Sequence, residues 1–111
     1  MIARRNDIPT VGGGDETFVM FGVLLNFLVA PDQTGNEISL IKGTLPPEVA
    51  IPLHKHPEPE VFYVLEGILE VHREDRAGWS TTQPGGVVAI PGNVKHALRN
   101  TSSALTTATK F

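Results

Sequence analysis

The segment Pro52-Leu-His-Lys-His-Pro-Glu-Pro-Glu60, which continues as Val61-Phe-Tyr-Val-Leu-Glu-Gly67, contains the pattern that decides the fold. His54 and His56 are two residues apart, and Glu60 follows four residues later. On an extended strand, alternate side chains point to the same face, so both imidazoles would lie on one side. Two imidazole nitrogens and a nearby carboxylate are typical ligands of a divalent first-row metal. The segment therefore predicts part of a metal site, with a further ligand supplied from elsewhere.

The composition is that of one globular domain. The chain has 111 residues, of which 41% are hydrophobic and 19% are charged, so it can form a single core. The net charge of −3 argues against a nucleic-acid partner, because such partners require a positively charged surface. The chain contains no cysteine, which excludes disulfides and thiolate metal sites and agrees with a reducing, cytoplasmic location.

The N-terminal part divides into a polar segment and an apolar one. Residues 1–17 are expected to be a flexible lead-in, and residues 18–111 to form the single domain. The apolar run Phe18–Ala30 is too short to span a bilayer, and acidic residues separate it from the N-terminal arginines, unlike a signal peptide. We expect a buried strand pair or a strand at a subunit interface, hence a homodimer and no membrane partner.

The remaining chain consists of short β-rich runs separated by turns about every ten residues. The expected strands are 37–45, 61–65, 68–73, 79–83, 87–90, 96–100 and 104–111. Because only Glu66-Gly67 separates 61–65 from 68–73, these two runs are expected to form a hairpin. No long amphipathic helical pattern is present. The pattern predicts an all-β sandwich or barrel.

Two histidines lie outside the opening segment. His72 shares a strand face with Glu70, which indicates the outer, solvated face of a sheet. His96 follows the turn Pro91-Gly-Asn93 and begins an expected strand. Beside His54, His56 and Glu60, it is the candidate for the fourth ligand.

These two segments resemble the paired motifs of the cupin superfamily, which read G(X)5HXH(X)3-4E(X)6G and G(X)5PXG(X)2H(X)3N. The matching residues are His54, His56, Glu60 and Gly67 for the first motif, and Gly85, Pro91, His96 and Asn100 for the second. The resemblance covers roughly residues 37–111. Three loop positions depart from the pattern: Glu48 and Asn93 replace glycines, and Gly86 stands where many cupins carry an acid. Asparagine tolerates left-handed backbone dihedrals, so the second turn can form.

The resemblance implies a double-stranded β-helix, or small jelly-roll barrel, with one divalent transition metal: iron, manganese, nickel, cobalt, copper or zinc. The implied ligands are His54, His56, Glu60 and His96. Glu58 is the rival carboxylate, but the prolines on either side hold it in the loop, and the spacing favours Glu60. Four protein ligands leave open positions on a six-coordinate ion, which suits Lewis-acid or oxygen chemistry.

Strand alternation predicts which side chains line the cavity around this metal. They are Phe62, Val64, Leu69, Val71, Arg73, Leu98 and Asn100. Two of them have simpler alternatives: Arg73 could emerge at the strand end, and Asn100 could cap a turn. The cavity is therefore expected to be mainly apolar and to hold a small-molecule ligand.

Three functions agree with such a site, and no catalytic residue is assigned beyond the metal ligands. The first is a dioxygenase-like enzyme, similar to single-domain cupins such as quercetinases that act on phenolic or diketone-type molecules. The second is a non-enzymatic module that binds or senses a small molecule. The third is a metal-dependent isomerase, epimerase or cyclase. It ranks last because sugar-phosphate chemistry needs several basic cavity residues, and only Lys42 and Arg73 are candidates.

Overall fold

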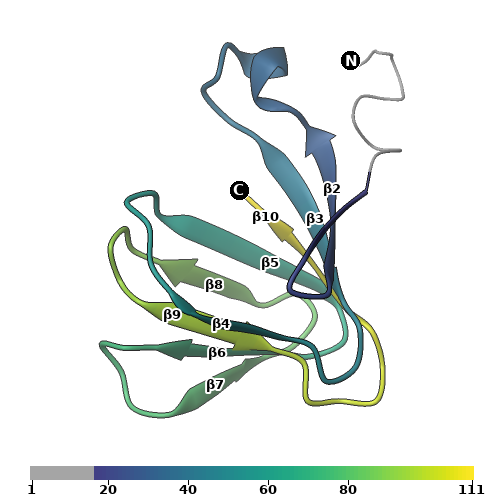
Figure 1. Ribbon diagram of the computed structural model, residues 1–111, viewed down its shortest axis with the longest axis vertical. Helices are drawn as coiled ribbons and strands as arrows, with labels where there is room; N and C mark the ends of the chain where they lie inside the picture. The colour runs from purple at the N-terminus through teal and green to yellow at the C-terminus, as the bar shows by residue number, and fades with distance from the viewer. Residues whose placement is uncertain (1–16) are drawn as a thin grey trace.

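The computed structural model describes residues 17–111, whose regular secondary structure is almost entirely β-strand (Figure 1). The strands are β1 (Phe18–Met20), β2 (Val23–Val29), β3 (Leu40–Leu45), β4 (Ala50–His54), β5 (Glu60–Glu66), β6 (Leu69–Arg73), β7 (Trp79–Thr82), β8 (Val87–Ile90), β9 (His96–Arg99) and β10 (Thr106–Lys110). One 3-10 helix, η2 (Pro31–Thr34), occupies the predicted turn between β2 and β3. Among the described residues, no helix has the length and hydrophobicity needed to cross a membrane. The predicted lead-in lies outside the described residues except for Thr17.

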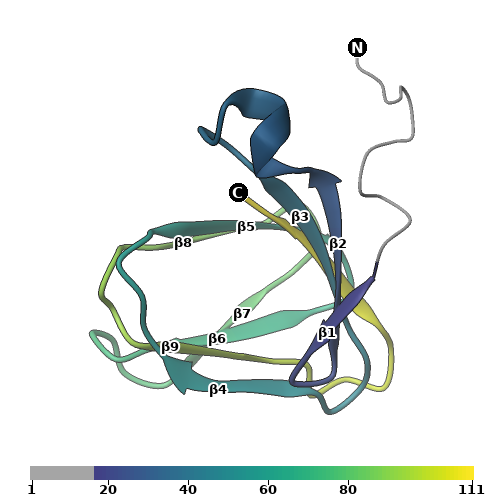
Figure 2. The same ribbon diagram turned by 45° about the horizontal axis from the view of Figure 1, so that its top comes forward.

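The strands form two sheets that face each other across the domain (Figure 2). The larger sheet has the order β1-β2-β3-β10-β5-β8, and the smaller has the order β4-β9-β6-β7. All of the neighbouring strands are antiparallel. This arrangement confirms the predicted all-β jelly-roll barrel.

The core lies between the two sheets and follows the alternation of the strands. In β5, Glu60, Phe62 and Val64 are buried, whereas Val61 and Tyr63 between them are exposed. The buried hydrophobic cluster contains Val23, Leu45, Phe62, Val64, Leu69, Val71, Ile90 and Leu98. Burial of each such side chain contributes about 1.5–3 kcal/mol. The cluster therefore holds the two sheets together and fixes which face of β5 points inward.

The predicted hairpin between 61–65 and 68–73 is wrong. β5 pairs with β10 and β8 in the larger sheet, whereas β6 pairs with β9 and β7 in the smaller one. Gly67, at φ 75°, packs against the backbone of Leu105 and Thr106, where a Cβ would collide. The Thr106 hydroxyl accepts a hydrogen bond from Ile68 N–H (3.1 Å) and donates one to its carbonyl oxygen (2.7 Å). Because Thr106 forms hydrogen bonds with both backbone polar groups of Ile68, the chain can cross from the larger sheet to the smaller one between β5 and β6.

The apolar segment Phe18–Ala30 forms the predicted strand pair, but Val23 is the only residue of β1 and β2 that is buried. β1 pairs with β2 in register and occupies the edge of the larger sheet. All three residues of β1 are exposed, with 67% of Val19 accessible. The strand predicted for residues 37–45 is shorter than expected, because β3 begins only at Leu40. The exposure of β1 leaves an apolar sheet edge on the surface of the described chain.

Two loop positions explain why the family motifs carry glycine. Glu48 and Asn93, which replace the motif glycines, have φ values of 66° and 65°. This left-handed region favours glycine, and asparagine tolerates it better than other residues do. The second turn therefore forms with Asn93, as expected, and the first holds Glu48 in a conformation that costs energy.

Candidate metal centre

The four predicted ligands lie in or beside two loops at one end of the barrel. His54 ends β4, His56 follows in the loop, and Glu60 begins β5. His96 is the first residue of β9, and the register of β4 and β9 places it opposite His54. The two-residue spacing predicts that His54 and His56 share one face of a strand. In the structure His56 is past the end of the strand, and the loop brings it to the same centre.

The three imidazoles and the carboxylate converge closely. One ring nitrogen from each of the three histidines lies within 4.8 Å of the others. The ring centroids of His54 and His96 are 4.4 Å apart, and those of His56 and His96 are 5.3 Å apart. The carboxylate of Glu60 reaches both His96 Nε2 (Oε1, 3.1 Å) and His56 Nε2 (Oε2, 3.2 Å). The three imidazoles are thus grouped closely enough to hold one ion, and Glu60 lies directly against two of them.

Backbone carbonyl groups orient all three rings. The Nδ1 atoms of His54, His56 and His96 lie 2.8–2.9 Å from the carbonyl oxygens of Pro52, Glu58 and Val94 respectively. A carbonyl oxygen only accepts hydrogen bonds, so each Nδ1 carries the hydrogen. In a neutral ring, Nε2 then presents its lone pair. Each imidazole is thus held in the tautomer that binds a metal through Nε2.

Glu60 is the buried anion of this cluster and is only 6% exposed. Lys110 Nζ lies 2.8 Å from its Oε2. Burial raises the pKa of Glu60, but the hydrogen bond and charge of Lys110, together with the positive charge that His56 and His96 carry when protonated, lower it more. The net effect is a pKa below the ordinary value, so Glu60 is ionised at neutral pH. Glu58, the rival carboxylate, has a largely exposed side chain whose Oε1 is 3.8 Å from His56 Nδ1.

The chemistry of this donor set fits a cation. Lone pairs on two Nε2 atoms face the oxygens of an ionised carboxylate at 3.1–3.2 Å. Two acceptors that face each other at this distance repel unless a proton or a metal ion lies between them. Imidazole nitrogen and carboxylate oxygen suit divalent transition metals. The cluster of three histidines and one glutamate therefore suggests a divalent metal.

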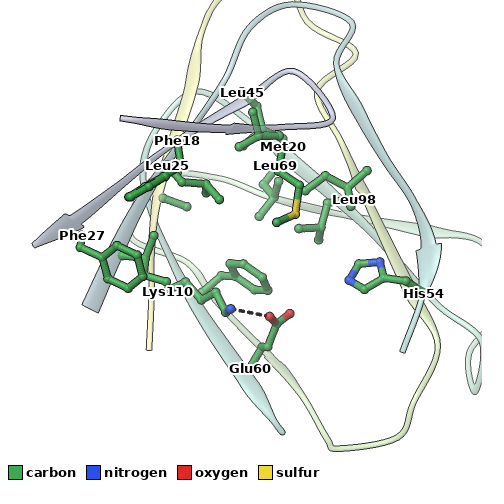
Figure 3. Close-up of a pocket in the computed structure, with 16 residues that line it drawn as sticks. Phe18, Met20, Leu25, Phe27, Leu45, His54, Glu60, Leu69, Leu98 and Lys110 are labelled. Atoms are coloured by element: carbon green, nitrogen blue, oxygen red, sulfur yellow. Dashed lines mark ion pairs between the residues drawn. The ribbon is translucent and has the colours of Figure 1, made fainter. Parts of the chain in front are cut away.

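A cavity of about 430 Å³ opens beside this cluster (Figure 3). Its lining residues are Phe18, Met20, Val23, Leu25, Phe27, Ile41, Gly43, Leu45, Ile51, His54, Glu60, Phe62, Leu69, Leu98, Ala108 and Lys110. The only polar side chains among them are His54, Glu60 and Lys110. The cavity is thus an apolar chamber with a polar end at the proposed ligands.

The structure divides the seven predicted cavity residues into three groups. Phe62, Leu69 and Leu98 line the cavity. Val64 and Val71 are buried in the core and do not line it. The two polar residues, Arg73 and Asn100, do not line the cavity either.

Arg73 and Asn100 follow their simpler alternatives. The Arg73 guanidinium pairs with both carboxylate oxygens of Asp75, at 2.9 and 2.7 Å, and donates to the Ala89 carbonyl. Asn100 is fully buried, where its amide donates to the Leu45 and Ala104 carbonyls and its oxygen accepts from Ser102. Arg73 is thus held by Asp75, and Asn100 by backbone carbonyl groups, and neither side chain lines the cavity.

The sequence reasoning missed the contribution of the N-terminal hairpin and of Lys110. The sequence pattern predicts a strand pair that contains Phe18, Met20 and Phe27, but it does not predict that these side chains line the cavity, as they do. Lys110 shares a face of β10 with Ala108, two residues earlier, so alternation relative to Ala108 could have suggested it. His72, in contrast, lies where its pattern placed it, on the outer side of β6 against Trp79 (ring centroids 5.6 Å apart).

Comparisons with known proteins agree with this fold. The family model described as "Cupin domain" matches residues 42–108, more than half of the chain. No curated protein sequence is significantly similar to the chain. Among solved structures, a predicted oxalate decarboxylase from Thermotoga maritima is similar, with a TM-score of 0.76 and 22% identity, covering 92% of this chain and 96% of that one.

Two further structures extend this likeness. The polyketide cyclase RemF from Streptomyces resistomycificus has a TM-score of 0.77 and 18% identity, covering 93% of this chain and 77% of that one. A Cupin 2 conserved barrel domain protein from Salinispora arenicola has a TM-score of 0.72 and 16% identity, covering 86% of this chain and 78% of that one. At these identities the likeness concerns the fold alone. With two antiparallel sheets, both sequence motifs and the match over residues 42–108, the chain belongs to the cupin family.

Proposed function

We propose that this cupin binds one divalent transition metal through His54, His56, Glu60 and His96. The observation that carries the proposal is the orientation of the donors. Three backbone carbonyl groups hold the imidazole Nδ1 atoms, which leaves the Nε2 atoms available to an ion, and the Glu60 carboxylate faces those of His56 and His96. Orientation of ligating histidines by a second hydrogen bond is typical of metal sites.

We further propose a dioxygenase-like reaction on a small phenolic or diketone-type molecule. His54 and Glu60 lie at the polar end of an otherwise apolar cavity, whose walls would pack against the substrate and exclude water. The metal, when bound, supplies a Lewis acid with open positions for oxygen ligands. For a β-diketone, one O2 is consumed, a carbon–carbon bond breaks, and a carboxylic acid and a 2-oxo aldehyde or ketone form. Both oxygen atoms enter the products, and the substrate supplies the electrons.

The reaction class is tested by turnover with and without oxygen. Full-length protein is loaded separately with iron(II), manganese(II) or nickel(II) and incubated with a flavonol or with pentane-2,4-dione. We expect oxygen uptake equal to substrate loss in air and no turnover under argon. The metal-free protein and a His96→Ala variant serve as controls. Absence of oxygen-dependent turnover with all three metals and both substrates would contradict the dioxygenase proposal.

A metal-dependent cyclase or isomerase is the second candidate, and Lys110 is the observation that favours it. Its ammonium group lies in the cavity, 2.8 Å from Glu60, where it could donate a proton to a substrate oxygen. The similar structure of a polyketide cyclase supports such chemistry on this fold. Product formation under argon with no oxygen uptake would favour this candidate. Recovery of an unchanged but tightly bound molecule would instead favour a binding module.

A further inference from the structure

Lys110 places a positive charge inside the apolar cavity. It lies near the end of β10, which is inserted between β3 and β5, and its register partners are Ile41 and Phe62. Its side chain is 35% exposed, and its ammonium group pairs with Glu60 at 2.8 Å. In Figure 3 Glu60 lies between Lys110 and His54, and Phe27 lies on the other side of Lys110. The cavity thus has one cationic side chain next to the proposed metal site.

The charges at this end of the cavity do not balance once a metal is present. A divalent ion and Lys110 together carry three positive charges, whereas Glu60 supplies one negative charge and neutral imidazoles supply none. In an apolar chamber, unbalanced charge is costly unless an opposite charge pairs with it. Occupancy of this cavity by a ligand with a negatively charged oxygen would remove that cost.

The apolar wall on either side of Lys110 suits a hydrophobic, aromatic body, because Phe62 is its register partner on β5 and Phe27 pairs with Ile41, its partner on β3. Phe18 and Phe27 meet edge to face, with ring centroids 6.0 Å apart, and both line the cavity with Met20 and Phe62. A volume of about 430 Å³ falls within the range of roughly 300–1,000 Å³ typical of small-molecule sites. Edge and face contacts of this kind favour aromatic ligands.

We propose that Lys110 is a specificity-determining residue that binds the anionic oxygen, a carboxylate or enolate, of a small aromatic ligand. This inference rests on the proposed function, since the ligand would occupy the same cavity. The ammonium group donates to the ligand oxygen while the aromatic body packs against the phenylalanines. The site therefore discriminates an anion from a neutral molecule of the same shape.

The test compares cinnamate with cinnamamide, its neutral isostere, by calorimetric titration of the full-length protein. Titrations are run on metal-free and on zinc-loaded protein, because zinc has no redox chemistry. We expect the unmodified zinc-loaded protein to bind cinnamate at least about tenfold more tightly than cinnamamide, the size of effect that one charge-assisted hydrogen bond supplies. In Lys110→Gln, cinnamate binding falls by about tenfold and cinnamamide binding changes by less than roughly twofold.

Two variants separate this role from a structural one. Lys110→Arg keeps the charge and should restore the preference for cinnamate. Lys42→Gln removes the cation at the neighbouring position of β3, which pairs with Thr109 and alternates with the cavity residues Ile41 and Gly43. Because Lys42 is on the other face of the sheet, its loss should leave both affinities unchanged.

The outcomes distinguish this inference from the proposed metal site. Equal affinities for the two probes in the unmodified protein, no detectable cinnamate binding at millimolar concentration, or an unchanged preference in Lys110→Gln would overturn the role of Lys110. If any of these occurs while zinc still binds stoichiometrically, the proposed metal site is retained and only the role of Lys110 is rejected. If zinc fails to bind but the Lys110-dependent preference persists in the metal-free protein, the metal proposal fails and the anion site remains.

Discussion

The backbone N–H of Asn93 donates a 2.8 Å hydrogen bond to the carbonyl oxygen of His56. This bond joins the loop before β9 to the loop between β4 and β5, and the proposed ligands of both motifs lie in or next to these loops. Beside it, Gly92 packs so closely on Pro57 that an added Cβ would collide with the Pro57 carbonyl oxygen. The position of His96 relative to His56 therefore depends on direct backbone contact between the two loops.

Substitution of Gly92 by alanine should separate these loops. The collision involves backbone atoms, which cannot rotate away as a flexible side chain could. We expect Gly92→Ala to lower the free energy of unfolding by roughly 1–3 kcal/mol and to weaken zinc binding by about tenfold or more. Urea denaturation and competitive zinc titration measure the two effects. Gly43→Ala is the matched control, because a Cβ there makes contacts of 3.8–3.9 Å, ordinary for packed atoms. Equal zinc affinity in both variants would contradict this account.

Glu48 offers a substitution that should stabilise the domain. Its φ of 66° is left-handed, and a residue with a Cβ is strained there. Relief of this strain in Glu48→Gly should exceed the extra entropy that glycine loses on folding, for a gain of roughly 0.5–1 kcal/mol. The free energy of unfolding from urea titration provides the measurement. In contrast, Glu66→Gly at the exposed end of β5 should lower the free energy of unfolding. If both variants changed this free energy in the same direction, backbone strain at Glu48 would be contradicted.

Metal binding should stabilise the fold in a way that depends on His96. An ion that binds only the folded chain adds about 2.7 kcal/mol at a concentration 100 times its dissociation constant. We expect zinc to raise the thermal midpoint of the unmodified protein and of His72→Ala, because His72 contacts Trp79 and Gly78 outside the cluster. The midpoint of His96→Ala should rise much less. A similar rise in all three proteins would place the metal elsewhere.

The contact between Arg73 and Asp75 should be visible as a pH effect remote from the cavity. The hydrogen bond from Arg73 is the main cause of the lowered pKa of Asp75. A lowered pKa means that this contact adds stability above the unfolded-state pKa of about 3.9, and that the added stability is lost as the pH falls through the lower folded-state value. In Arg73→Gln, NMR titration should show the Asp75 pKa returned toward its ordinary value. Cinnamate affinity should not change, and a change would mean that Arg73 reaches the cavity after all.

The exposed edge strand predicts self-association. β1 has no partner on its outer side among the described strands, and its Val19 and neighbouring apolar residues are exposed. An apolar sheet edge is a template for pairing with another chain. We expect a homodimer at micromolar concentration in sedimentation, and a monomer for Val19→Lys. Thr81→Lys, on the exposed face of β7, is the control that should remain dimeric. A monomeric unmodified protein would refute the expectation.

Much of the fold and of the site could be predicted because the signals are short-range. The alternation of Glu60, Phe62 and Val64 predicted an inward face, and all three are buried. The spacing around His54 and His96 predicted four residues that the structure brings together, because each motif is a local loop with a preferred shape. Even the departures at Glu48 and Asn93 carry information, since both have the left-handed backbone that glycine would supply.

What the sequence did not reveal depends on which strands become neighbours. The runs on either side of Gly67 have the pattern of a hairpin, yet they belong to different sheets because β10 takes the place beside β5. The same insertion brings Lys110 to Glu60, fifty positions earlier in the chain. The sequence by itself thus determined most of the strands, the inward face of β5 and the four residues of the proposed metal site, because two-residue periodicity and loop geometry act over a few residues. Only the tertiary structure decided the strand order and the charge of the cavity, because these follow from burial of the whole core, to which every strand contributes at once.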